Sequence, residues 1–142
     1  MKNLFFSVSI ALIAALTLSC DEKECCVDLD DETTSILGQW ILSERGFSPG
    51  SGYIVEPVSS EPPQIIELKG NGELATTVGG LTDYKFYAVD GDVVGFFRTY
   101  PGPAPDRSTF THSYQVVYED GKLKLYFRYC VEGCHLGFKR LD

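Results

Sequence analysis

The chain of 142 residues has little methionine, little tryptophan and no basic stripe. Methionine stands only at position 1, and there is one tryptophan, Trp40. Lys and Arg number 12 against 20 Asp and Glu, which gives a formal net charge of −8. Proteins that bind nucleic acid present clustered basic side chains to its phosphates. The charge balance therefore argues against nucleic acid as a partner.

The chain also lacks an apolar run long enough to cross a bilayer as a permanent helix. The longest such run, Leu4 to Leu16, falls short of the length that a spanning helix needs. It follows a basic start at Lys2 and is followed by a small residue, Ser19, and then Cys20. This layout predicts a secretory signal peptide over residues 1–19.

The segment Leu16-Thr17-Leu18-Ser19-Cys20 resembles a bacterial lipobox, although Thr17 stands where an aliphatic residue is usual. In such proteins the cysteine becomes the new N-terminus and carries acyl chains such as palmitate. The resemblance implies a lipoprotein of the bacterial cell envelope, anchored through Cys20 at the outer membrane or the cell surface. An ordinary secreted protein, cleaved close to the same point, is the alternative.

Residues 20–35 are acidic and poor in apolar side chains. Between Asp21 and Ser35 seven acidic residues stand against Lys23 alone. This composition predicts a disordered tether. The pair Asp21-Glu22 resembles acidic signals that route some lipoproteins to the cell surface, and a plain solvated spacer explains it equally well. From residue 36 onward 13 acidic and 10 basic residues nearly balance, so residues 36–142 form the predicted domain.

The domain shows the closely spaced turns and alternating apolar pattern of antiparallel β structure. Abundant glycine (14), phenylalanine (9) and tyrosine (8) favour an all-β fold. We predict no helix and eight strands, over 38–47, 64–69, 73–78, 84–89, 93–100, 109–118, 122–130 and 135–141. Strand 122–130 alternates cleanly, whereas 84–89 and 93–100 have apolar residues on both faces, which leaves their inward sides open.

The connections between these strands are of two kinds. Three are tight turns with Gly beside Asn or Asp, at 70–72, 90–92 and 119–121. The long loops are 48–63 and 101–107. Because alternate connections of an up-and-down meander lie at the same end, the tight turns should close a base and the long loops should surround a mouth.

Gly38-Gln39-Trp40 matches the Gly-x-Trp of lipocalins, and Arg140 on the last strand matches the arginine that packs over that tryptophan. With the strand count and the sorting of the loops, residues 36–142 resemble the lipocalin-like domains of small bacterial lipoproteins. The resemblance implies an eight-stranded antiparallel up-and-down β-barrel, with Trp40 and Arg140 as a structural pair at its base. The C-terminal helix of lipocalins is absent.

The chain has five cysteines. If Cys20 is acylated, the four others permit three pairings. Cys130 and Cys134 flank the last turn within disulfide reach, and exported proteins meet oxidising conditions, so we predict a bond between them. Cys25 and Cys26 could pair with each other, link to another chain or stay reduced.

Several short motifs resemble those of haem, zinc or hydrolase sites, but each lacks a feature that the site requires. Cys130 to His135 spells Cys-x-x-x-Cys-His, one residue longer than the c-type haem motif, and the cysteine spacing matches no usual zinc pattern. Gly46 to Gly50 spells Gly-x-Ser-x-Gly, but Pro49 has no N–H for an oxyanion hole. His112 and Ser113 are adjacent on a strand and should point to opposite faces. We therefore predict no enzyme, no metal and no cofactor.

The function predicted first is a binding module for a small, partly hydrophobic molecule. Aromatic residues of two neighbouring strands would line the mouth, namely Phe110, Tyr114, Phe127 and Tyr129, and loop 48–63 could act as a lid. The alternative is a structural or interaction lipoprotein of the envelope, whose barrel is filled by its own side chains. The oligomeric state stays open.

Overall fold

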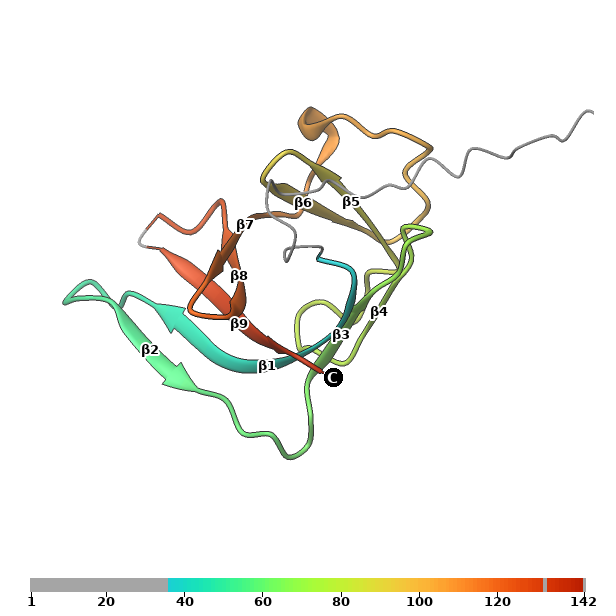
Figure 1. The fold of residues 1–142 in the computed structure, drawn as a ribbon. Helices are drawn as coiled ribbons and strands as arrows, with labels where there is room; N and C mark the ends of the chain where they lie inside the picture. The colour runs from blue at the N-terminus through green and yellow to red at the C-terminus, as the bar shows by residue number, and fades with distance from the viewer. Residues whose placement is uncertain (1–35, 132, 142) are drawn as a thin grey trace, which may run out of the picture.

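The computed structural model describes residues 36–131 and 133–141, which form an all-β domain (Figure 1). The predicted signal peptide, Cys20, and the tether with Cys25 and Cys26 lie outside the described residues. Within the described ranges no helix has the length and hydropathy to cross a membrane.

The strands form one antiparallel sheet that curls around a common interior (Figure 1). Its order is β4, β3, β1, β9, β8, β7, β6, β5. The strands are β1 (Gly38–Phe47), β2 (Ile54–Pro57), β3 (Ile65–Leu68), β4 (Leu74–Thr76), β5 (Phe86–Asp90), β6 (Val93–Phe97), β7 (Ser113–Glu119), β8 (Lys122–Phe127) and β9 (Cys134–Arg140). A short 3₁₀ turn, η1 (Arg107–Thr109), precedes β7.

The sheet nearly closes on itself between β4 and β5. An isolated bridge joins Glu73 to Phe86, and the Leu74 amide donates to the Lys85 carbonyl at 2.8 Å. Leaving β2 aside, every strand lies beside its neighbours in the chain, and β9 returns to β1. The prediction of an eight-stranded up-and-down barrel is therefore confirmed, with strand ends that differ by a few residues.

The ninth strand, β2, lies within the segment predicted as loop 48–63. It pairs with the second half of β1, with Arg45 opposite Glu56 and Phe47 opposite Ile54. The strand forms there because β3 covers only Gly38 to Ile41 of β1 and leaves the rest of that edge unpaired. All four residues of β2 are exposed.

The base of the barrel is filled by side chains. The largest fully buried residues include Trp40, Leu42, Phe96 and Phe138. The inward faces of β5 and β6, which the sequence left open, carry Tyr87, Val94 and Phe96. These rings and aliphatic groups belong to one buried core cluster with Trp40 and Phe138.

Trp40 lies at the centre of the base, where both ends of the domain meet. Its indole Nε1 donates to the Ile36 carbonyl at 2.9 Å. The Arg140 guanidinium lies 5.1 Å from the centre of the tryptophan ring, and its Nη2 donates to the Leu37 carbonyl at 3.0 Å. Arg140 is thus held in place over the ring by the residue that directly precedes β1.

A β-bulge interrupts β1 at Ser43. Leu42 pairs with Phe138 of β9 and Glu44 with Gly137, so Ser43 is an extra residue without a counterpart. The bulge inverts the faces of the strand. Trp40 and Leu42 point into the barrel before it, whereas Arg45 and Phe47 line the interior after it.

We expect Trp40→Ala to lower the free energy of unfolding by about 3–5 kcal/mol, because it empties the best-packed part of the core. Arg140→Gln should cost only about 1 kcal/mol, since it removes one cation–π contact and one hydrogen bond. Urea unfolding followed by circular dichroism measures both changes. A Trp40→Ala variant as stable as the wild type would contradict this role.

Candidate functional site

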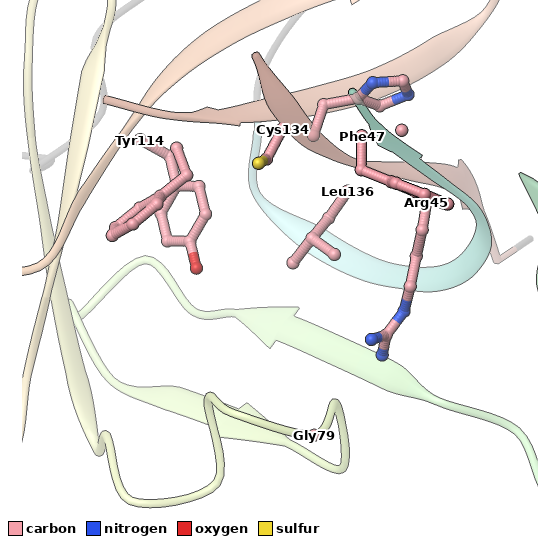
Figure 2. Close-up of a pocket in the computed structure, with 9 residues that line it drawn as sticks. Arg45, Phe47, Gly79, Tyr114, Cys134 and Leu136 are labelled. Atoms are coloured by element: carbon pink, nitrogen blue, oxygen red, sulfur yellow. The ribbon is translucent and has the colours of Figure 1, made fainter. Parts of the chain in front are cut away.

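A cavity of about 360 Å³ opens at the end of the barrel opposite Trp40 (Figure 2). It lies where β1 ends, where β9 begins and beside the connection between β4 and β5. Its lining consists of Arg45, Gly46, Phe47, Gly79, Tyr114, Phe127, Cys134, His135 and Leu136. The interior is therefore open at the mouth, as the sorting of the loops predicted.

One wall of the cavity is aromatic. The rings of Tyr114 and Phe127 lie 5.4 Å apart, and His112 Nε2 lies 3.1 Å from the Tyr114 hydroxyl. His112 in turn stacks on Tyr84 at 4.8 Å. Burial raises the pKa of Tyr114 to about 12, and burial followed by the charge of Arg98 lowers the pKa of His112. Both groups are therefore uncharged at neutral pH.

The facing wall comes from β1 and β9. Figure 2 shows Arg45, Phe47 and Leu136 across the opening from Tyr114, with Gly79 at one side. Cys134 lies on the same wall and forms a disulfide with Cys130, with a Cα–Cα distance of 5.7 Å. The disulfide closes the turn between β8 and β9, so the chain at this rim has little freedom to move away.

Two of the four aromatic residues predicted at the mouth, Tyr114 and Phe127, line the cavity. The prediction for Phe110 is wrong. The segment before β7 folds back over the outside of the barrel, where the Phe110 ring covers Gly95 and meets Phe97 at 5.5 Å. The alternation predicted from residue 109 does not reach it, because β7 begins only at Ser113.

The prediction for Tyr129 is also wrong. Strand β8 ends at Phe127 instead of residue 130, and the chain then turns toward the disulfide. The side chain of Tyr129 is 61 % exposed and meets Phe127 edge-on at 5.7 Å. It therefore lies on the rim, outside the cavity.

Sequence reasoning missed Arg45, because strict alternation from Trp40 points Arg45 outward. Only the bulge at Ser43 brings its guanidinium to the cavity. No residue type in Ser43-Glu44 demands a bulge, and Gly137 opposite Glu44 is the one local signal, since glycine often stands where another side chain crosses the backbone.

The bulge places a second group of polar residues on the outer face of the barrel. His135 Nε2 donates to Glu44 Oε1 at 3.2 Å, and Lys122 Nζ donates to the other carboxylate oxygen. Because the carboxylate can only accept, Nε2 carries a proton, and Nδ1 shares a hydrogen bond with the Tyr53 hydroxyl. This outer cluster joins β1, β8 and β9 to the segment that leads into β2.

The outer cluster needs two glycines. A Cβ at Gly46 would collide with His135 and the Tyr53 hydroxyl, and one at Gly137 would collide with the side chain of Glu44. Burial alone would raise the pKa of Glu44, but hydrogen bonds from Lys122 and His135 outweigh it, so the pKa of Glu44 is lowered. Glu44 thus remains an anion that holds three strands together.

No group of three or more His, Cys, Asp or Glu side chains in the described ranges is arranged to hold a metal ion. His135, which follows the two cysteines of the haem-like motif, has both ring nitrogens engaged in the outer cluster. No family model matches this chain, and neither a curated protein nor a solved structure matches it.

We expect the outer cluster to make stability depend on pH. Since its folded pKa is depressed, Glu44 stabilises the fold above the ordinary glutamate pKa, and this contribution is lost as the pH falls through the folded value. Glu44→Gln should therefore cost about 1–3 kcal/mol at pH 7 and much less at pH 3. Urea unfolding at several pH values measures the difference.

Glu56→Gln serves as the matched control, because exposed Glu56 forms no ion pair within the described part of the chain. It should change stability little at either pH. A Glu44→Gln cost that stayed constant from pH 7 to pH 3 would show that the carboxylate charge is not what holds the cluster.

Proposed function

We propose that this chain is a lipid-anchored lipoprotein of the bacterial cell envelope whose lipocalin-like barrel binds a small, partly hydrophobic molecule at its mouth. The observation that carries the proposal is the contrast between the two ends of the barrel. Side chains fill the base, whereas a cavity of about 360 Å³ with largely apolar walls opens at the other end. Binding, without a chemical reaction, is the activity proposed.

The size and chemistry of the cavity support a small ligand. Cavities that bind small molecules enclose roughly 300–1,000 Å³ and combine apolar walls with a few polar groups. This cavity is at the lower end of that range, with Phe47, Phe127 and Leu136 as apolar walls and few polar side chains. A ligand of one ring or a short chain fits better than a long lipid.

A second candidate function is interaction with another envelope component. It is favoured by β2, whose outer edge pairs with no other strand of the described residues and whose Ile54 and Val55 are 41 % and 49 % exposed. An exposed strand edge can add a strand from a partner. In this alternative the cavity would stay empty.

Native mass spectrometry of the protein after mild extraction tests the binding function. We expect a co-purifying small molecule with the wild type and none with Leu136→Phe, which adds bulk to the cavity wall. Tyr129→Phe is the control, because Tyr129 lies outside the cavity, and it should keep the adduct. Thermal unfolding checks that both variants fold. A wild type that is repeatedly empty would favour the interaction function.

Lipid anchoring has its own test. We expect Cys20→Ser to move the protein from the membrane fraction to the soluble fraction, because it removes the thiol that would carry the acyl anchor. Cys25→Ser, a neighbouring cysteine in the tether, should leave the protein with the membranes. Fractionation and immunoblotting measure the distribution, and membrane retention of Cys20→Ser would refute the anchor.

A further inference from the structure

We infer that the cavity selects small carboxylates with an apolar body, whose carboxylate group pairs with Arg45. This inference rests on the proposed binding function and names the chemical class of its ligand. It is carried by a guanidinium that the bulge brings to a largely apolar cavity and that meets no carboxylate within the described residues.

The position of Arg45 is fixed by the backbone of β1. After the bulge at Ser43, Arg45 pairs with Leu136 of β9 and Phe47 with Cys134, and all four residues line the cavity. Glu44, the neighbouring charged residue, is directed outward into its own cluster with Lys122 and His135. The strand thus sends its carboxylate outside and its guanidinium to the cavity.

The charge of Arg45 has no counterion in the described part of the chain. Its Nη2 donates to Gln64 Oε1 at 3.0 Å, and this amide oxygen is neutral. Glu56 stands opposite Arg45 in the register of β1 and β2, but its side chain is exposed and makes no ion pair with Arg45. Arg45 therefore keeps most of its donors for another acceptor.

Three other arginines of the domain have a partner for the guanidinium charge. Arg98 lies 3.5 Å from Asp83, and Arg107 lies 3.0 Å from Asp92. Arg140 has no acidic partner among the described residues either, but it lies over the Trp40 ring and donates to the Leu37 carbonyl. Of these four arginines Arg45 is the one that borders the cavity.

The surroundings of Arg45 determine which class of ligand the cavity binds most tightly. A guanidinium is more weakly hydrated than an ammonium group, and a carboxylate can accept two parallel hydrogen bonds from its planar fork. An amine would be repelled, and an alcohol would offer a single neutral acceptor. Tyr114, Phe127 and Leu136 lie close enough to surround the apolar body of such a molecule.

A matched set of three ligands tests the selection. Phenylbutyrate, phenylbutanol and phenylbutylamine share one apolar body and differ in the charge of the head group. Ligand-observed NMR titrations with the full chain in a non-ionic detergent at neutral pH give the dissociation constants, after partition into protein-free micelles is subtracted. We expect phenylbutyrate to bind at least tenfold more tightly than phenylbutanol and phenylbutylamine to bind most weakly.

Variants of the arginine locate the source of the selection. Arg45→Gln should weaken phenylbutyrate binding about tenfold and change phenylbutanol binding less than twofold, and Arg45→Lys should keep part of the preference. Arg128→Gln is the matched control: it removes the same charge from an exposed residue at the same end of the barrel and outside the cavity. It should leave all three affinities unchanged.

The outcomes separate this inference from the proposed function. If the three ligands bind equally, or if the preference for phenylbutyrate survives in Arg45→Gln, the inference fails and the binding function stands. If none of the three ligands binds to the wild type, both fail. A loss of phenylbutyrate binding in Arg128→Gln as large as in Arg45→Gln would show a general charge effect and would also overturn the role of Arg45.

Discussion

The arrangement of this barrel depends on one extra residue in β1. If β1 ran through Ser43 as a regular strand without a bulge, unbroken alternation would carry Glu44 and Gly46 to the interior and Arg45 to the outside. With it, the same strand supplies apolar side chains to the base and a different set of residues to the mouth. A single bulge thus lets one strand serve both the packed base and the cavity at the mouth. A regular strand would present only one set of alternating residues to the interior.

The bulge also explains the burial pattern of β1. Buried residues alternate without interruption along the strand, from Trp40 to Gly46, although the strand changes face in the middle. Trp40 and Leu42 are covered by the core, whereas Glu44 and Gly46 are covered on the outside by Lys122, His135 and Tyr53. Burial alone therefore does not reveal which side of the sheet a residue occupies.

Much of the fold was predictable, because turns and alternation are local properties. Gly beside Asn or Asp marked the three tight turns, and Trp40 and Arg140 stand near the start of the first strand and the end of the last.

The residues at the mouth were harder to predict. Phe110 and Tyr129 failed because both lie just beyond a strand end, where alternation stops. Arg45 was missed because its inward direction depends on the bulge. The bulge arises from the pairing of β1 with β9, which the sequence of β1 alone does not reveal. Strand β2 was missed for a related reason: its partner edge is free only because β3 is short.

The entry of the chain at the base has a geometric consequence. Ile36 accepts the hydrogen bond of the Trp40 indole, and roughly 20 Å of β1 separate Trp40 from the cavity residue Phe47 at strand spacing. The segment before Ile36 therefore joins the domain at the pole opposite the opening. A force applied to that segment enters the domain at the start of β1, which is hydrogen-bonded to a neighbouring strand on each side. Because the opening lies at the other pole, an attachment at residue 36 does not cover it.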